Sequence, residues 1–368
     1  MDKLTLILHF SFGVSLITQC YFWIVIFKRA SIPDTQKTIN TDNKQISIIV
    51  CALNEYKNLC NLIPKLLDQK YNDFEVIIIN DRSTDQTLNL LRSVKDSRFS
   101  FLTINTTPHG IDHKKYALQK GIKKAKFEFV LLTDADCIPN SDEWVYEMQK
   151  SLSNKEIVLG LSFYEKRDSF INKFIQYETF YTAVQYIGFS HFGKPYMGVG
   201  RNLLYKKELF IKNTEFKKFK SHIGGDDDLV LQQFMSSKNT TTALAWISQT
   251  TSIPKENYKE WFSQKKRHLS AGTKYPKIIK RYLAALHISH FTFYLIVFFS
   301  FYYVDILLFT LVGYLLRTLI IFSIFGSVSK RFGNQLTKKE IIQGDILYMI
   351  YFFITGIFTL YTKKSKWK

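Results

Sequence analysis

The chain has 368 residues, of which 46% are hydrophobic, and its formal net charge is +19. This length exceeds that of one ordinary soluble domain and allows a sizeable core. The last quarter is much richer in Phe, Leu, Ile and Tyr than the middle. Such a division is typical of a soluble domain joined to membrane segments.

The basic residues gather beside apolar runs, at residues 28–29, 265–267, 277–281, 330–331 and 363–368. Cytosolic flanks of membrane helices retain Lys and Arg, so this pattern favours a membrane protein over a nucleic-acid binder. The cysteines, Cys20, Cys51, Cys60 and Cys137, form no CxxC pair. We therefore expect neither a disulfide framework nor a zinc site, and a reducing cytosol is the simplest context.

Four apolar runs are candidates for membrane helices: residues 4–27, 283–304, 306–326 and 346–361. Lys28 and Arg29 follow the first run and predict that the next segment is cytosolic. A cleaved signal peptide is the rival interpretation, but only Lys3 precedes the run and no small-residue cleavage site follows it. Four full spans would leave the basic tail 363–368 outside, against the positive-inside rule. Either the last run is interfacial or re-entrant, or an earlier run does not span.

Between these runs the pattern alternates between strands and helices. This rhythm predicts an α/β fold with a mostly parallel, doubly wound sheet, in which ligands bind at the carboxyl ends of the strands. The predicted strands are residues 46–52, 74–80, 99–105 and 127–133, and the predicted helices are residues 58–68, 84–95 and 114–124.

Polar residues follow three of the predicted strands. Glu55 follows the first, Asp81 the second, and Asp134 with Asp136 the fourth. Two carboxylates at i and i+2 suit Mg²⁺ or Mn²⁺, which would neutralise a diphosphate leaving group, although a lone pair of loop aspartates is usually only solvated. Ser83 or Thr84 is expected to cap the next helix, with Asp85 in its first turn, and this leaves Asp81 unexplained.

Two further clusters lie nearer the C-terminus. Asp226, Asp227 and Asp228 are adjacent carboxylates, of which one could act as a general base. The alternative is an acidic helix N-terminus, which the helix dipole favours. Gln264 and Arg267 could hold a diphosphate. Taken alone, their segment is better interpreted as a basic helix at the membrane surface.

In this order the clusters resemble the family 2 glycosyltransferases, which have the GT-A nucleotide-sugar fold, over roughly residues 45–275. Residues 48–55 look like the opening strand with its N-E pair. Residues 80–85 look like the D-D-G-S-T-D motif, with Asn80 in place of the first Asp and Arg82 in place of Gly. Asp81 is therefore the safer contact for a base or ribose. Asp134 and Asp136 match the metal-binding D-x-D.

The resemblance extends to four other segments. Residues 113–118 are similar to the segment that places a Lys near the nucleotide, and residues 197–202 to the loop that meets donor sugar and acceptor. The Asp226–Asp228 run stands where the family has its E-D base motif. Alignment of Asp228 with the usual D-L puts Asp226 on the base, with Asp227 as a close rival. Residues 264–268 are similar to Q-x-x-R-W, but His268 replaces the Trp associated with acceptor stacking in processive synthases.

The resemblance implies an inverting, hexosyltransferase-like enzyme that moves a sugar from a nucleotide-diphosphate donor to a membrane-associated, possibly lipid-linked acceptor. UDP is the default nucleotide, and GDP or dTDP are the alternatives. We expect a multi-pass protein of the inner membrane with a cytosolic catalytic domain and no nucleic-acid partner. A processive polysaccharide synthase and exporter, or a non-catalytic membrane scaffold, are the other possibilities.

We expect four segments along the chain and one site in the catalytic domain. The N-terminal transmembrane helix takes residues 1–29, the linker 30–44, the GT-A catalytic domain 45–282 and the C-terminal transmembrane region 283–368. The base is Asp226 or Asp227, and Mg²⁺ or Mn²⁺ binds Asp134 and Asp136. The nucleotide-sugar contacts are Ala52, Asn54, Glu55, Asp81, Lys114, Asp134, Gly200, Arg201, Gln264 and Arg267.

Overall fold

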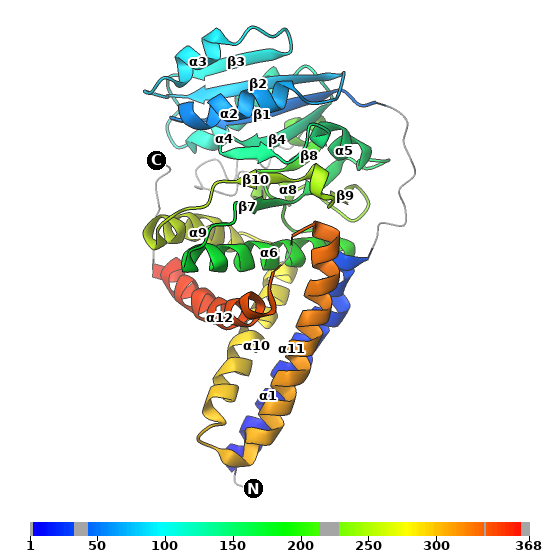
Figure 1. The fold of residues 1–368 in the computed structure, drawn as a ribbon, viewed down its shortest axis with the longest axis vertical. Coiled ribbons are helices and arrows are strands. Elements are labelled where there is room, and N and C mark those ends of the chain that lie inside the picture. The colour runs from blue at the N-terminus through cyan, green and yellow to red at the C-terminus, as the bar shows by residue number, and fades with distance from the viewer. Residues whose placement is uncertain (1–2, 33–42, 213–227, 335, 362–368) are drawn as a thin grey trace. The chain divides into compact units, whose positions relative to one another are not determined.

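The computed structural model describes residues 3–32, 43–212, 228–334 and 336–361. These residues form two compact units, which are described separately below (Figure 1). Of the described residues, the sheet unit comprises 43–165, 193–212 and 228–255. The helical unit comprises Met1–Pro33, Lys166–Phe192 and Glu256–Lys363.

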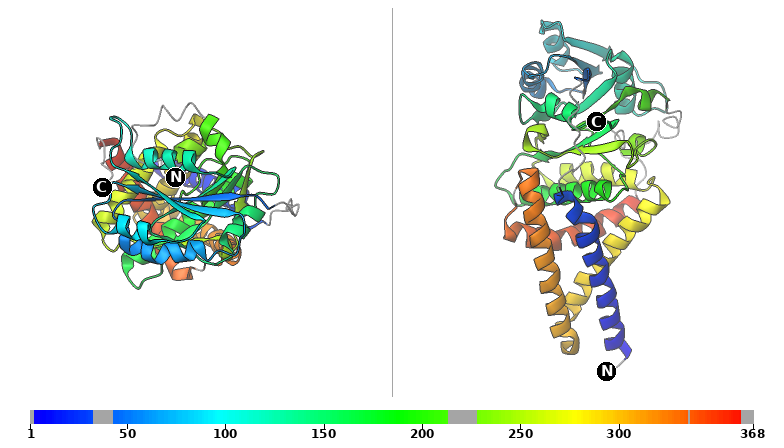
Figure 2. Two further views of the ribbon diagram at one scale, coloured as in Figure 1. Left: turned by 90° about the horizontal axis from the view of Figure 1, so that it is seen from above. Right: turned by 90° about the vertical axis from the view of Figure 1, so that its right-hand side faces the viewer.

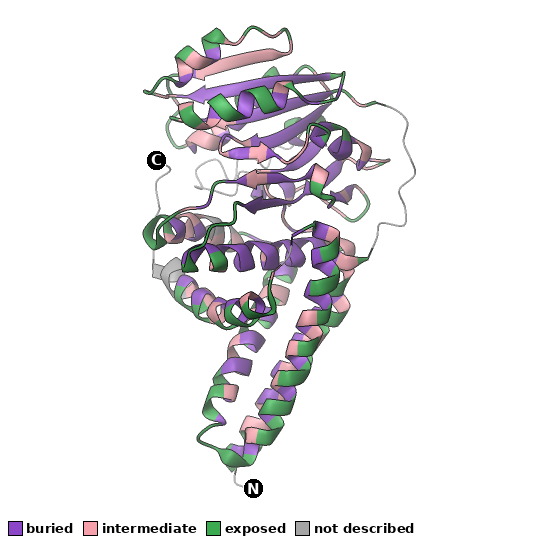
Figure 3. Ribbon diagram, in the orientation of Figure 1, coloured by how far each residue is buried: buried purple, intermediate pink, exposed green. Residues whose placement is uncertain are grey.

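A seven-stranded sheet in the order β3-β2-β1-β4-β8-β6-β9 forms the centre of the sheet unit. The first four strands along the chain pair in parallel: β1 (Ile46–Ala52), β2 (Phe74–Asp81), β3 (Phe99–Ile104) and β4 (Phe129–Asp134). β1 and β2 are buried along almost their whole length (Figure 3), which explains their unbroken apolar sequence. β8 (Leu203–Lys206) is antiparallel to β4 and to β6 (Ile157–Gly160), and β9 (Thr240–Ala243) is parallel to β6. The prediction of a mostly parallel α/β sheet is confirmed.

Helices cover both faces of this sheet (Figure 2, left). α2 (Tyr56–Leu67) packs on the face that carries Ile46, Ile48 and Val50. α4 (His113–Lys124) packs on the opposite face, where Gly121 lets it approach closely. A Cβ at Gly121 would lie 2.7 Å from Cγ2 of Ile49. The other helical segments of this unit are α3 (Thr87–Ser93), α5 (Trp144–Lys150), α7 (Lys207–Lys212), α8 (Asp228–Leu231) and the 3₁₀ turn Trp246–Ser248.

A second, three-stranded sheet holds the segment that follows β4. It has the order β5-β10-β7, with β5 (Cys137–Pro139), β10 (Thr250–Ser252) and β7 (Ser162–Tyr164). β5 begins directly after Asp136, and the backbone N–H of Ile253 donates to the carbonyl of Asp136 at 3.3 Å. The Ala135-Asp136 loop is therefore anchored by a strand at each end.

The predicted cap of the second helix is wrong. α3 begins at Thr87, and its N-cap is Gln86 rather than Ser83 or Thr84. The side-chain oxygen of Asn54 accepts from the N–H of Thr84 at 2.7 Å and holds the residues before Gln86 in a loop. Asp85 precedes the helix and accepts from the N–H of Thr87 at 3.0 Å.

The helical unit contains α1 (Lys3–Tyr21), α6 (Phe170–His191), α9 (Tyr258–Gly272), α10 (Lys277–Phe299), α11 (Val304–Phe332) and α12 (Lys338–Tyr361). α1 continues through the π-helical turn Phe22–Ile26 and the 3₁₀ turn Phe27–Ser31. Among the described residues, three segments are long and apolar enough to cross a membrane: Lys3–Ser31, Lys277–Phe299 and Val304–Phe332. α1 lies beside α10 and α11, whereas α6 runs crosswise to them (Figure 2, right). The predicted apolar run 346–361 forms the latter part of α12, which is not among the three segments.

A buried polar network joins five helices of this unit. Arg317 of α11 is only 1% exposed, and its Nη1 lies 2.5 Å from Oδ2 of Asp345 on α12. Gln19 of α1 accepts from Nη2 of Arg317 at 3.0 Å. Asp345 also accepts from the hydroxyls of Tyr177 (α6) at 3.2 Å and Tyr294 (α10) at 2.5 Å. A charge that is expensive in an apolar setting is therefore paired and fastens α12 to α11.

Replacing Arg317 by Met should destabilise the protein by about 3–5 kcal/mol, because it leaves the Asp345 carboxylate buried without its cation. The measurement is thermal unfolding of the full-length protein in detergent. The double variant Arg317→Met/Asp345→Asn removes both charges and keeps an oxygen acceptor for the tyrosines. It should recover most of the lost stability, and equal losses in the two variants would contradict the pairing.

Candidate active site at the sheet edge

Three neighbouring strands bring the predicted polar residues to one edge of the sheet. In the order β2-β1-β4, Ala52 aligns with Asn80, and Cys51 aligns with Asp134. Asn54, Glu55 and Asp136 come just after these strands, so they lie at the same edge of the sheet. Ala52 itself is buried. This is the edge at which open parallel sheets bind their ligands.

Two loops at this edge are tied together by hydrogen bonds. The backbone N–H of Asn54 donates to Oγ of Ser83 at 2.9 Å, while Oδ1 of Asn54 accepts from the N–H of Thr84. The N–H of Glu55 donates to Oγ1 of Thr87 at 3.2 Å. Asn54 adopts a positive φ of 57°, which Asn tolerates better than most residues. Asn54 thus joins the loop after β1 to the loop after β2.

Asp81 is fully buried and held by its neighbour in sequence. Nε of Arg82 lies 2.8 Å from Oδ1 of Asp81, and Nη2 lies 3.0 Å from Oδ2. Nη1 of Arg82 lies 3.3 Å from Nε2 of His113, at the start of α4. Both oxygens of the predicted base or ribose contact are therefore engaged by a guanidinium group.

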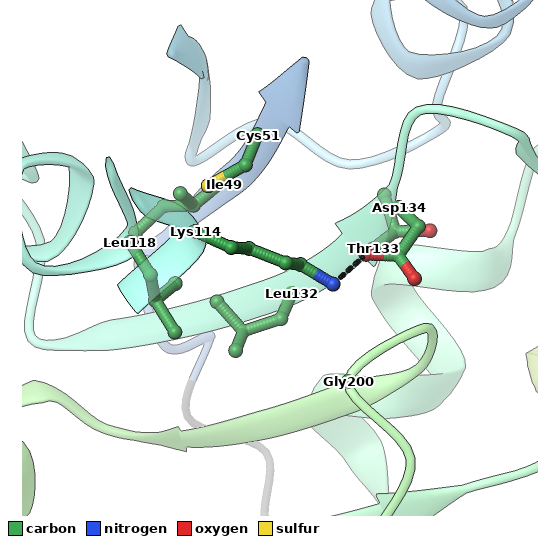
Figure 4. Close-up of a pocket in the computed structure, with 8 residues that line it drawn as sticks. All are labelled: Ile49, Cys51, Lys114, Leu118, Leu132, Thr133, Asp134 and Gly200. Atoms are coloured by element: carbon green, nitrogen blue, oxygen red, sulfur yellow. Dashed lines mark hydrogen bonds and ion pairs between the residues drawn. The ribbon is translucent and has the colours of Figure 1, made fainter. Parts of the chain in front are cut away.

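A small pocket opens beside the end of β4 (Figure 4). Lys114 reaches from the first turn of α4 to Asp134, with its Nζ 2.9 Å from Oδ1. The backbone of Gly200 lines the pocket on another side. The remaining lining residues are Ile49, Cys51, Leu118, Leu132 and Thr133.

Asp134, Asp136 and Cys137 offer ligand atoms that lie within 4.8 Å of one another. Burial and the charge of Asp134 raise the pKa of Asp136, and burial raises the pKa of the Cys137 thiol well above its usual value. Carboxylates suit a hard cation such as Mg²⁺ or Mn²⁺, whereas a protonated thiol does not. The residues present therefore fit a divalent cation on Asp134 and Asp136, without Cys137.

Several carboxylates and cations lie close together at this edge. Burial raises the pKa of Glu55, and the charges of Asp136 and Asp134 raise it further, against a hydrogen bond from Asn58 that lowers it. Arg201 attracts Asp136, and its guanidinium lies 4.5 Å from the ring centre of Tyr164. Nη1 of Arg201 is buried and has no hydrogen-bond partner among the described residues. An anionic group bound to a cation at this edge would supply one.

The other predicted site residues are distributed differently. Gln264 and Arg267 lie on α9 of the helical unit. Asp226 and Asp227 lie outside the described residues. The structure also places three residues at this edge that were not predicted as site residues: His113, Arg82 and Tyr164. Arg82 had a signal in the sequence, because it replaces a glycine of the motif, and His113 directly precedes Lys114. Tyr164 had none.

Replacing Asp136 by Asn should raise the melting temperature of the ligand-free protein at pH 7. The folded protein raises the pKa of Asp136, so its ionised form disfavours folding at neutral pH. This penalty disappears as the pH falls below the ordinary carboxyl pKa, so the gain should shrink by pH 4. Asp96→Asn is the matched control with the opposite sign, because Arg98 lowers the pKa of Asp96. A lower melting temperature for Asp136→Asn would contradict the raised pKa of Asp136.

The chain is similar to known proteins over part of its length. The family model Glycosyl transferase family 2 matches residues 47–214. The poly-beta-1,6-N-acetyl-D-glucosamine synthase of Staphylococcus aureus (strain COL) is 30% identical over 131 residues, which are 35% of this chain and 31% of that protein. The protein of the same name from Staphylococcus epidermidis is 30% identical over 115 residues, which are 30% and 26% of the two chains. The match thus spans about a third or less of these curated relatives.

Among solved structures, the mannosyltransferase PcManGT from Pyrobaculum calidifontis, in complex with GDP-Man and Mn²⁺, has a TM-score of 0.61 to this chain. The likeness covers 96% of each chain at 17% identity, so it concerns the fold alone. It agrees with the GT-A arrangement of the sheet. The segment of residues 47–214 is thus similar to glycosyl transferase family 2.

Proposed function

We propose that the protein is an inverting glycosyltransferase. It moves a sugar from a nucleotide-diphosphate donor, by default a UDP-sugar, to a membrane-associated, lipid-linked acceptor. One observation carries the proposal: within a family 2 domain, Lys114, Asp134, Asp136 and Arg201 meet at the ligand-binding edge of the sheet. Raised carboxyl pKa values at such an edge are typical of functional sites, which favours an enzyme over a non-catalytic scaffold.

The donor diphosphate would lie against these residues. Asp134 and Asp136 would hold Mg²⁺ or Mn²⁺, and that ion would stabilise the negative charge of the departing diphosphate. Lys114 and the unpartnered Nη1 of Arg201 would donate to phosphate oxygens, because both are cationic and lie beside the two aspartates. The solved neighbour with GDP-Man and Mn²⁺ supports a nucleotide-sugar and a divalent cation as a pair.

The transfer itself needs a base and an in-line geometry. Asp226, or its rival Asp227, would take the proton from an acceptor hydroxyl. The acceptor oxygen would then form its bond to the anomeric carbon from the face opposite the diphosphate. The bond from that carbon to the diphosphate oxygen breaks in the same step, with inversion.

Two polar residues of α9 are further candidates for hydrogen bonds to the donor diphosphate. Lys265 of this helix is buried and paired with Glu178 of α6, which is also buried. The neighbouring Gln264 and Arg267 are half-buried. α9 is therefore not simply a basic surface helix with all its cations exposed to lipid. We assign Gln264 and Arg267 to the leaving diphosphate.

Three membrane spans would remove the conflict between the predicted runs and the positive-inside rule. If Lys3–Ser31, Lys277–Phe299 and Val304–Phe332 all cross the membrane, residues 32–276 and the segment after Phe332 lie on the same side. Lys330 and Arg331, at the end of the last span, and the basic tail then lie on the cytosolic side with residues 32–276, as the positive-inside rule requires. We propose a multi-pass inner-membrane protein with this orientation.

A polysaccharide synthase is the second candidate, because the matched staphylococcal relatives are named as synthases of a polymer. The identity covers only 131 residues, and residue 268 is His where processive synthases of the family have Trp. We therefore favour an enzyme that transfers a single sugar over a polysaccharide synthase. The length of the product made by the purified enzyme separates the two.

Asp136→Ala should lower donor turnover by at least roughly a hundredfold, because it removes a ligand of the ion that neutralises the leaving group. The assay measures nucleotide release from UDP-, GDP- and dTDP-sugars, with membrane lipids as acceptor and Mn²⁺ or Mg²⁺ present. Asp142→Ala is the matched control, since Asp142 is an exposed acid of the same unit that pairs with Lys70. Undiminished transfer by a folded, membrane-bound Asp136→Ala protein would refute the metal site.

The two candidate bases can be separated by single substitutions. Asp226→Asn and Asp227→Asn should differ, with the base variant losing about 10²–10⁴-fold in turnover while its donor affinity stays unchanged. The measurement is single-turnover transfer alongside titration with the donor. Full activity in both variants would exclude this acidic run as the source of the base.

A further inference from the structure

The segment that follows β2 differs from the glycine-containing motif it resembles. Asp81 is fully buried, and both of its oxygens accept hydrogen bonds from Arg82, at 2.8 and 3.0 Å. The residue before it is Asn80, a neutral amide, where that motif has another carboxylate. The end of this strand therefore presents a neutralised carboxylate rather than a free hydrogen-bond acceptor.

The backbone at Arg82 is unfavourable for an arginine. Its φ is +57°, in the left-handed region that glycine adopts without cost. A non-glycine residue is sparsely found there and costs about 1 kcal/mol or more. Strain of this kind persists where the surrounding structure uses the side chain, which directs attention to what the guanidinium contacts.

The guanidinium of Arg82 extends from the end of β2 to the start of α4. Its Nη1 lies 3.3 Å from Nε2 of His113, and the next residue, Lys114, is paired with Asp134. The Arg82 side chain remains 29% exposed, whereas that of Asp81 is 0% exposed. A ligand arriving at this end of β2 thus meets the remaining N–H groups of Arg82 before it can reach Asp81.

We propose that Arg82, held by Asp81 and beside His113, reads the nucleobase of the donor and selects bases with a keto group. An arginine only donates hydrogen bonds. Uracil and guanine present a carbonyl oxygen at positions where cytosine and adenine carry an amino group, and an amino group would face Arg82 with another donor. Asp81 is then the positioning residue that orients the guanidinium. This inference rests on the proposed nucleotide-sugar donor.

The test is calorimetric binding of UDP, GDP, CDP and ADP to the full-length protein in detergent with Mn²⁺. The unaltered protein should bind UDP or GDP at least roughly tenfold more tightly than CDP and ADP, as expected for a base-edge contact through arginine. The preferred nucleotide of the pair identifies the base as uracil or guanine. Arg82→Gly suits the backbone, Arg82→Lys keeps the charge without the planar fork, and both should lose this preference.

Arg98→Lys is the matched control, because Arg98 makes a similar two-point contact to Asp96, two residues away, at the start of β3. It should bind all four nucleotides as the unaltered protein does. Tighter or unchanged UDP binding by Arg82→Gly would show that Asp81 reads the base directly, and would overturn the assignment. Equal losses for all four nucleotides would also overturn it, since they would place Arg82 at the phosphates. Absence of nucleotide binding by the unaltered protein would instead refute the proposed function itself, and the inference with it.

Discussion

Like charge gathered at one edge of a parallel sheet is the constraint on which the site depends. The order β2-β1-β4 brings the ends of three strands together, and each end carries an acid on or just beyond it. Carboxylates so placed repel one another, and burial strengthens the effect because less water screens them. Burial is the main cause of the raised pKa values of Asp136 and Glu55, and repulsion by the neighbouring carboxylates adds to it. Buried carboxylates of this kind favour a ligand that brings positive charge to them.

In the ligand-free protein, cationic side chains partly neutralise these carboxylates. Lys114 pairs with Asp134, Arg82 pairs with Asp81, and Arg201 attracts Asp136. Lys114 and Asp134 come from α4 and β4, so their pairing depends on the close packing of α4 that Gly121 allows. Binding of a metal-bound diphosphate would exchange Lys114's contact with Asp134 for contacts to phosphate. Donor binding is then an exchange of ionic partners within a nearly preformed site.

The fold of the sheet unit could be predicted because its parallel strands are buried on both faces and appear as unbroken apolar runs. β1 was predicted with its observed bounds, and the acidic residues at the strand ends were recognised from their position alone. The course of the loops could not be predicted. Ser83 and Thr84 resemble helix caps by local propensity, but the side chain of Asn54, some thirty residues earlier, takes the N–H of Thr84 instead. A contact so distant in sequence leaves no periodic signal.

The antiparallel β8 and the small sheet of β5, β7 and β10 were likewise absent from the prediction, because strands of three or four residues carry too little periodicity. The contact of Arg201 was also absent from the prediction. The family resemblance singled out Arg201, but its contact with Tyr164 of β7 joins residues too far apart in sequence to leave a local pattern. The predictions for Asp226 and Asp227 remain predictions.

Buried charges in the helical unit show what a structural ion pair looks like in the same chain. Asp345 receives Arg317 and two tyrosine hydroxyls, and Glu178 receives Lys265. These acids are matched by donors from neighbouring helices, so they serve packing. Asp136 and Glu55 form no direct ion pair among the described residues, and burial raises the pKa of each despite the attraction of Arg201 for Asp136. Within one protein, this difference separates carboxylates that hold helices together from carboxylates at the edge where the donor is proposed to bind.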